Sequence, residues 1–146
     1  MTSHFLTDLI TCLALLVYVW NFTAVGQARQ KYAIKAPAVT GNPDFERVFR
    51  VQQNMVEQLI VFLPALWIFS MTVSPLWGAV VGAIWVVGRV LYSAAYYSDA
   101  EKRGLGFTIS ALAAAVLLLG GLLGTLRFLI GLRLSSELMI TPLDNM

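Results

Sequence analysis

The chain has 146 residues, of which 58% are hydrophobic and 12% are charged, and its formal net charge is +2. An average soluble domain carries about 25% charged residues, so this composition excludes an ordinary soluble domain and a disordered chain. The small net charge gives no support for nucleic acid binding, and the single cysteine excludes an intrachain disulfide and a cysteine-based metal centre. We therefore expect no metal.

Four long apolar segments follow one another along the chain, at about 5–25, 51–73, 76–97 and 105–132. A helix needs about 20 mostly apolar residues to cross about 30 Å of hydrocarbon, so each segment predicts one membrane-spanning helix. The first segment is too long for the core of a signal peptide. The sequence thus predicts an all-α, integral membrane four-helix bundle that forms a single domain over 1–146.

The connections between the predicted spans differ in composition. Residues 26–50 are polar and contain two prolines, which predicts a loop. Residues 72–75 predict a tight uncharged turn, 98–104 a short charged turn, and 135–146 a loose tail.

Basic residues gather in the first and third connections, and the second connection has none. They are Arg29, Lys31, Lys35, Arg47, Arg50, Lys102 and Arg103. The positive-inside rule places these two connections in the cytoplasm and both termini on the opposite side, although Arg127 and Arg133 count slightly against this orientation. We expect a bacterial inner membrane or an endoplasmic reticulum membrane, and the short loops slightly favour the bacterial one.

Polar residues inside the second and third spans carry the functional signal, because ionisable groups are costly in hydrocarbon and tend to face a bundle interior or a wet cavity. In the second span, Arg50, Asn54 and Glu57 are spaced i, i+4 and i+7, which places them on one helical face. Glu57 lies about 10 Å along the helix axis from Arg50.

A second polar face lies on the third span, where Arg89, Tyr92 and Tyr96 are spaced i, i+3 and i+7. If this helix continues, Arg103 stays near the same face. Arg89 lies at a depth similar to that of Glu57, so the two are predicted to pair. Together the two faces predict a polar cleft, open to the cytoplasm and rimmed by arginines, that suits a small anionic ligand.

Each of these features also has a purely structural interpretation. The Glu57–Arg89 pair can simply join two helices, and Arg50 and Arg103 can be interfacial anchors. Aromatic belts are common at membrane surfaces, and Gly-x-x-x-Gly spacing more often indicates close helix packing than function. The residues concerned are Trp20, Tyr92, Tyr96 and Tyr97 for the belt, and Gly120 and Gly124 for the packing.

Two motifs resemble a known family. Residues 41–57 read Gly-Asn-Pro-Asp-Phe-Glu-Arg-Val-Phe-Arg-Val-Gln-Gln-Asn-Met-Val-Glu, and the second motif is Arg89-x-x-Tyr92-x-x-x-Tyr96, followed seven residues later by Arg103. Both resemble the MAPEG superfamily, the membrane-associated proteins of eicosanoid and glutathione metabolism. The similarity is closest to the branch of cysteinyl-leukotriene synthase and type-two microsomal glutathione transferase.

The resemblance implies a homotrimer with glutathione bound between adjacent subunits in the cytoplasmic half of the bundle. It implies that Arg103 faces the thiol, that Glu57 takes the α-amino group, that Arg50 and Arg29 take the carboxylates, and that Arg89 supports Glu57 from behind. The full glutathione set is Arg29, Arg50, Gln52, Asn54, Glu57, Tyr92 and Tyr96. The chain departs from the synthase pattern at Gln30, where a second arginine is expected, and at Gln58, where a tyrosine is expected.

The expected function is a membrane-bound glutathione transferase, with glutathione as co-substrate and a hydrophobic electrophile drawn from the membrane lipids, together with glutathione-dependent reduction of lipid hydroperoxides. A guanidinium favours a thiolate over a thiol and stays charged at any relevant pH, so Arg103 is the expected catalytic residue. The alternative is a non-catalytic lipid-binding scaffold resembling the five-lipoxygenase-activating protein. A small transporter is less favoured, because the chain has no internal repeat.

Overall fold

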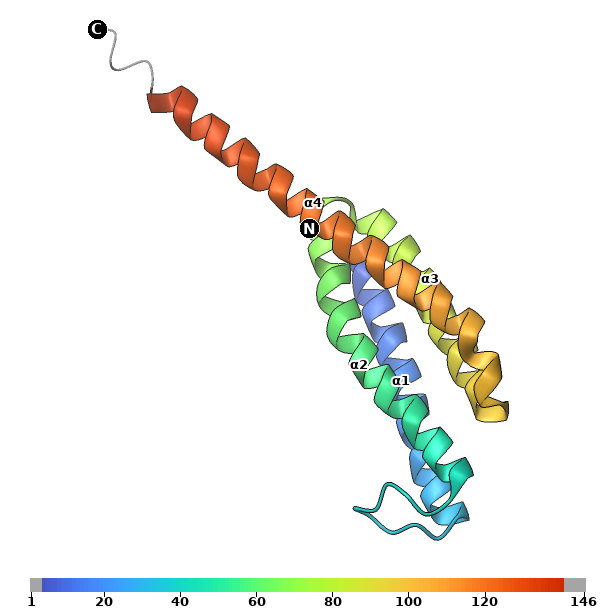
Figure 1. The fold of residues 1–146 in the computed structure, drawn as a ribbon. Helices are drawn as coiled ribbons and strands as arrows, with labels where there is room; N and C mark the ends of the chain where they lie inside the picture. The colour runs from blue at the N-terminus through green and yellow to red at the C-terminus, as the bar shows by residue number, and fades with distance from the viewer. Residues whose placement is uncertain (1–3, 141–146) are drawn as a thin grey trace, which may run out of the picture.

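The computed structural model describes residues 4–140, with side chains through residue 133, and contains four long α-helices (Figure 1). A short 3₁₀ helix, η1, connects the third helix to the fourth. Three of the four predicted spans lie within one long helix each, and the second, 51–73, extends one residue past the end of its helix at Thr72. All four helices are long and apolar enough to cross a membrane. The elements are α1 (Phe5–Lys31), α2 (Pro43–Thr72), α3 (Pro75–Ser98), η1 (Ala100–Arg103) and α4 (Gly104–Ile140).

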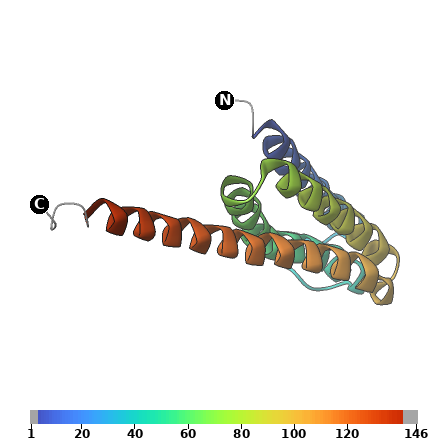
Figure 2. The same cartoon turned by 90° about the horizontal axis from the view of Figure 1, so that it is seen from above.

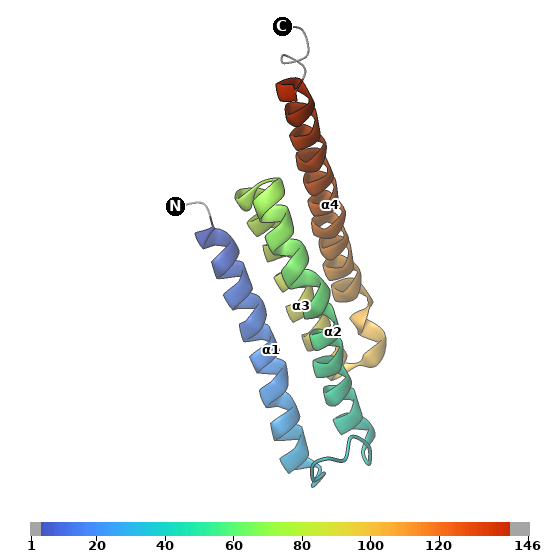
Figure 3. The same cartoon turned by 90° about the vertical axis from the view of Figure 1, so that its left-hand side faces the viewer.

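Helices α2 and α3 form the centre of the bundle. Helix α1 packs against both of them, and α4 also packs against both. Figures 2 and 3 show α1 and α4 on opposite sides of this central pair, and they show the second half of α4 extending well past the other helices. The 32–42 loop and η1 lie at the same end of the bundle, which we call the charged end.

The first connection is shorter than the sequence predicts. Helix α1 continues through Lys31 and α2 begins at Pro43, so the predicted loop over 26–50 shrinks to 32–42. Proline is favoured at the first helical position, and the Asn42 side chain caps the helix by accepting hydrogen bonds from the backbone N–H groups of Asp44 (2.9 Å) and Phe45 (3.2 Å). The prediction was wrong because loss of hydrophobicity marks the edge of the hydrocarbon, whereas a capped helix can continue beyond that edge.

Two other connections also contain helix. The charged turn at 98–104 holds η1, and α4 continues to Ile140, so the predicted loose tail is wrong for residues 135–140. Residues 141–146 lie outside the described residues. The tight turn at 72–75 is confirmed, since α2 ends at Thr72 and α3 begins at Pro75.

The interior of the bundle is apolar and tightly stacked. Phe62 of α2 and Trp85 of α3 are both fully buried, and their rings lie parallel with centroids 3.7 Å apart. The outer surface is also apolar, with large exposed side chains on every long helix, among them Leu16, Ile60 and Leu123. Lipid chains solvate such an apolar surface, whereas water does not. Four long apolar helices with this outer surface therefore indicate an integral membrane protein.

Glycines allow α4 to approach its neighbours closely. A side chain at Gly106 would collide with the backbone nitrogen of Tyr92 and would lie 2.7 Å from the carbonyl oxygen of Gly88. Farther along α4, a Cβ at Gly120 would lie 2.5 Å from the Phe69 ring, and one at Gly124 would lie 2.6 Å from the hydroxyl of a threonine at the end of α2. The packing interpretation of the Gly120–Gly124 spacing is therefore confirmed.

Helix α1 is held to its neighbours by hydrogen bonds inside the apolar core. Near the charged end, the fully buried Asn21 donates to the Ser93 hydroxyl (3.1 Å) and accepts from the Tyr97 hydroxyl (2.7 Å). Near the opposite end, the Thr7 hydroxyl donates to the Ser70 hydroxyl (3.1 Å). These bonds satisfy polar groups that would be costly if left unpaired, and they set the register of α1 against α2 and α3.

Candidate functional site

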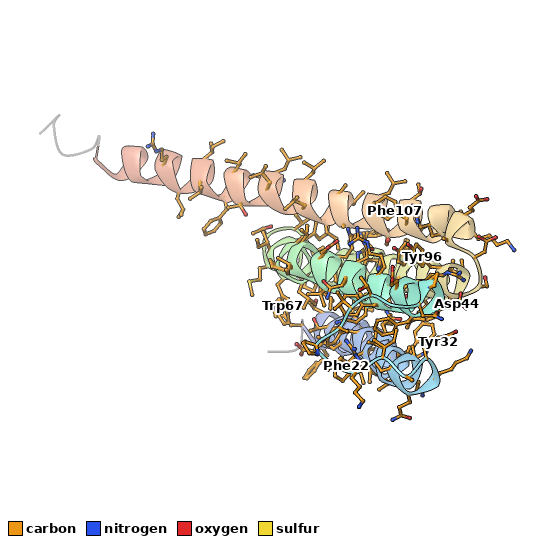
Figure 4. The ribbon with its side chains drawn as sticks, turned by 60° about the horizontal axis from the view of Figure 1, so that its bottom comes forward. Phe22, Tyr32, Asp44, Trp67, Tyr96 and Phe107 are labelled. Atoms are coloured by element: carbon orange, nitrogen blue, oxygen red, sulfur yellow. The ribbon has the colours of Figure 1, made fainter. Side chains whose placement is uncertain are left out.

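A cavity of about 400 Å³ opens near the charged end of the bundle. The helices α2, α3 and α4 and the short helix η1 all contribute side chains to it. Figure 4 shows two of these side chains, Tyr96 and Phe107, close together between α3 and α4. The lining residues are Arg50, Asn54, Glu57, Tyr92, Tyr96, Arg103 and Phe107. Six of these seven were identified from the sequence as site residues.

Helix α2 contributes both a positively and a negatively charged side chain to the cavity. Arg50, Asn54 and Glu57 all line the cavity, as their helical spacing predicts. Arg50 and Glu57 are exposed. Within the described part of the chain, Arg50 makes no hydrogen bond or ion pair, so its guanidinium is available to a ligand.

The predicted Glu57–Arg89 ion pair is absent, because an amide lies between the two groups. Arg89 Nη1 donates to Asn54 Oδ1 at 3.1 Å, and Asn54 Nδ2 faces Glu57 Oε2 at 3.5 Å. Among the described side chains, the only ion pairs within 4.0 Å are Arg47–Asp44 and Lys102–Asp99. Glu57 therefore forms no ion pair within 4.0 Å among the described side chains, and its contact on this side is the Asn54 amide.

The tyrosines of α3 form the floor of the cavity. Tyr92 and Tyr96 are only 4% and 8% exposed, which excludes membrane-belt positions for both. Their ring centroids are 5.5 Å apart, and the guanidinium carbon of Arg89 lies 4.2 Å from the centre of the Tyr92 ring, within the range of a cation–π contact.

Arg103 reaches the cavity through a change of chain direction, not along a continuous helix. Helix α3 ends at Ser98, and Asp99 then caps η1 by accepting from the backbone N–H of Glu101 at 3.0 Å. The short helix brings Arg103 back over α3, where Nη1 donates to the Tyr96 hydroxyl at 3.2 Å. Helix α3 does not continue to Arg103, so the conditional argument from helical spacing does not apply to this residue, yet Arg103 still lines the cavity.

Two of the predicted glutathione residues lie outside this cavity. Arg29 donates from Nη1 to the carbonyl oxygen of Ala38 (2.8 Å), lies 5.0 Å from the Phe45 ring centre, and lines a separate cavity of about 450 Å³ on α1 together with Gln30. Gln52 is half-buried on α2 and does not line the site. Within one chain, the geometry therefore brings neither residue to the other six.

The structure adds residues that were not identified from the sequence. Phe107 of α4 lines the cavity and is 44% exposed. A neighbouring cavity of about 530 Å³ shares Arg50 and Tyr96 with the site and adds Phe49 and Gln53. A lone phenylalanine at the start of an apolar span looks the same in sequence as a lipid-facing one, so no signal could have singled out Phe107.

The site carries an excess of positive charge. Three guanidinium groups (Arg50, Arg89 and Arg103) and one carboxylate (Glu57) surround or support the cavity, which gives a formal net charge of +2. Such a site favours an anionic ligand that also carries one cationic group for the carboxylate.

The sequence profile of the MAPEG family matches residues 7–123, which include every site residue described above. The chain belongs to the MAPEG family. Its relatives include an uncharacterized protein of the cyanobacterium Synechocystis sp., which is 49% identical over 118 residues, covering 81% of this chain and 86% of that protein.

Relatives with named activities belong to the two groups of the predicted branch. Human microsomal glutathione S-transferase 2 is 44% identical over 100 residues, covering 68% of each chain. Bovine leukotriene C4 synthase is 28% identical over 130 residues, covering 89% of this chain and 87% of the synthase. The resemblance seen in the two sequence motifs is therefore confirmed for this MAPEG chain.

Proposed function

We propose that this MAPEG protein is a membrane-bound glutathione transferase that conjugates glutathione to hydrophobic electrophiles. The observation that carries the proposal is the cavity near the charged end, where Arg50, Glu57 and Arg103 offer separate partners for a carboxylate, an ammonium and a thiolate. The relatives named as microsomal glutathione S-transferase 2 support the same activity.

Glutathione matches the site in charge as well as in its chemical groups. Its thiolate form carries two carboxylates, one ammonium and one sulfur anion, so its net charge is opposite and equal to the formal +2 of the site. The thiol form carries one negative charge less. Charge balance therefore favours the ionised form of the bound tripeptide.

Arg103 is the proposed catalytic residue. A free thiol titrates near pH 8.5, and only the thiolate is a good nucleophile. A guanidinium beside the sulfur lowers the thiol pKa, and the proton leaves to water at the open side of the cavity. The sulfur then forms a bond to the electrophilic carbon. In a substitution the bond from that carbon to the leaving group breaks, and its electron pair departs with the leaving group; in an addition the π bond of an activated double bond breaks, and the resulting carbanion takes a proton from water.

The electrophile is proposed to come from the bilayer. Phe107 lines the cavity and is also partly exposed on the apolar outer face, so an apolar substrate can reach the sulfur along α4. The same thiolate can attack the terminal oxygen of a lipid hydroperoxide. The O–O bond breaks, the lipid alkoxide takes a proton from water and leaves as the alcohol, and glutathione is left as a sulfenic acid. A second glutathione converts this to the disulfide and water.

A homotrimer would complete the site. Arg29 and Gln52 lie outside the cavity of their own chain, and a neighbouring subunit could present them to it. Arg29 would then bind a glutathione carboxylate next to the one held by Arg50. We propose that the charged end faces the cytoplasm, as the distribution of Lys and Arg predicts.

The test is turnover by purified protein in detergent. Bound thiolate is followed by its ultraviolet absorbance, and chlorodinitrobenzene then serves as the electrophile. A thiolate signal at neutral pH together with formation of the conjugate supports the proposal. Glutathione binding without thiolate or conjugate points instead to the alternative, a lipid-binding scaffold, and absence of glutathione binding contradicts both the ligand and the activity.

A further inference from the structure

Arg89 is an unusual residue for the middle of an apolar bundle. Its side chain is fully buried, and no carboxylate of the described residues lies within 4.0 Å of it. Its Nε and Nη2 atoms are buried without a hydrogen-bond partner within the described part of the chain, and its one hydrogen bond goes to Asn54. A buried charge with so few partners is costly, so its presence calls for a physical reason.

The contact with Asn54 dictates how that amide is turned. Arginine carries only donors, so the carbonyl oxygen of Asn54 must face Arg89, and the NH₂ group must then face the other way. That other side holds the Glu57 carboxylate, 3.5 Å from Asn54 Nδ2. The carboxylate favours the same orientation of the amide, so Arg89 fixes Asn54 from one side while the NH₂ group of that amide contacts Glu57 on the other.

The amide also keeps Arg89 and Glu57 from pairing directly. A direct guanidinium–carboxylate contact would engage one or both carboxylate oxygens in strong hydrogen bonds. The separation of 3.5 Å between Asn54 Nδ2 and Glu57 Oε2 is long for a hydrogen bond, so the carboxylate is steadied but not saturated. Glu57 is exposed in the cavity, where an incoming ammonium can reach it.

We propose that Arg89 is a positioning residue which, through the amide of Asn54, holds Glu57 as a free carboxylate for the α-amino group of the ligand. This inference rests on the proposed glutathione site. It assigns to Arg89 an effect on one end of the ligand only, the end that carries the ammonium. The thiol end is served by Arg103, which lies on a different element and contacts Tyr96 instead.

A pair of ligands separates this role from a general structural one. The affinities of glutathione and of its deaminated analogue, which has hydrogen in place of the α-amino group, are measured by calorimetry on the full-length protein in detergent. We expect the wild-type protein to prefer glutathione by about tenfold, the size of one charge-assisted hydrogen bond. In Arg89→Met the preference should fall to about threefold or less, while the affinity for the analogue changes little. Arg89→Lys, which keeps a charged donor, should restore part of the preference.

Trp85→Phe is the matched control. Trp85 is fully buried four residues before Arg89 on the same face of α3 and does not line the cavity. This control should keep the wild-type preference even if it lowers both affinities. If Arg89→Met does not fold, Asn54→Leu replaces it as the test variant. This change breaks the same connection from Arg89 to Glu57, so the variant should also lose the preference for glutathione over the analogue.

An unchanged preference in Arg89→Met, or in Asn54→Leu where that variant decides, overturns the inference. Equal weakening of both ligands in Arg89→Met also overturns it, since that result is expected of a residue with only a structural role. A wild-type protein that binds glutathione with no preference over the analogue overturns it as well, and leaves the proposed function standing. A wild-type protein that binds no glutathione overturns the proposed function itself.

Discussion

Replacing Arg103 by alanine should leave a glutathione-binding protein that has lost most of its activity at neutral pH. At pH 7, only about 3% of a thiol with a pKa near 8.5 is ionised. A neighbouring guanidinium lowers such a pKa by about 1–3 units, and Arg103 is exposed, so screening by water places the effect near the lower end of that range. A shift of about one unit raises the thiolate fraction roughly eightfold, and one of 1.5 units roughly sixteenfold.

Turnover of Arg103→Ala should therefore fall by about tenfold at pH 7, and the deficit should shrink to less than about twofold near pH 9. The sign follows from the lowered thiol pKa: the advantage exists only below the pKa of the free thiol and vanishes as the pH rises through it. The assay is a pH profile of chlorodinitrobenzene conjugation, together with the ultraviolet absorbance of bound thiolate. Arg103→Lys should retain part of the activity because it keeps the positive charge.

Lys102→Ala is the control, because Lys102 is a neighbouring exposed cation that does not line the cavity. It should match the wild-type protein at every pH. An Arg103→Ala protein with the wild-type thiolate signal at pH 7 would refute the assigned role. A deficit of the same size at pH 7 and pH 9 would also refute it, because the loss would then not come from ionisation of the thiol.

Three further changes test other parts of the structure. Glu57→Gln should raise the KM for glutathione by about tenfold through loss of the ammonium partner while leaving the pH profile of kcat unchanged, and a change confined to kcat would contradict this role. Gly106→Ala should destabilise the bundle by about 1–3 kcal/mol, because the added methyl group collides with the backbone of α3. Gly104→Ala is the control and should have little effect, because a methyl group there meets nothing within 4 Å. Equal melting temperatures of the two variants in detergent would refute the close helix crossing. Asn21→Leu removes two hydrogen bonds inside the core and should cost about 1–3 kcal/mol in the same melting assay, and a wild-type melting temperature would show that these bonds carry no stability.

Much of the site could be predicted from helical spacing. A helix has a fixed period, so residues at i, i+4 and i+7 share a face wherever the helix packs, and Arg50, Asn54 and Glu57 do line one cavity. The same holds for Tyr92 and Tyr96 on α3. Contacts between helices have no such regularity. That is why the sequence predicted a Glu57–Arg89 pair and the structure placed Asn54 between the two residues.

Contacts formed across a change of chain direction could not be derived from helical spacing. Arg103 reaches Tyr96 because α3 stops at Ser98 and η1 turns the chain back, whereas a continued helix would have carried Arg103 farther along the axis of α3. Phe107 follows on α4, and its place beside the tyrosines depends on the close crossing of α3 and α4 at Gly88 and Gly106.

The sequence by itself determined the class of protein, the number of membrane-spanning helices and the family, because each depends on local composition or on short motifs. Hydrocarbon solvates any apolar helix of sufficient length, whatever its neighbours. Only the tertiary structure decided which polar groups meet inside the bundle, since burial forces each donor to find an acceptor among whatever side chains the packing supplies. Asn21 shows this most simply. In the sequence it only interrupts an apolar run, but in the folded bundle it joins α1 to α3 through Ser93 and Tyr97.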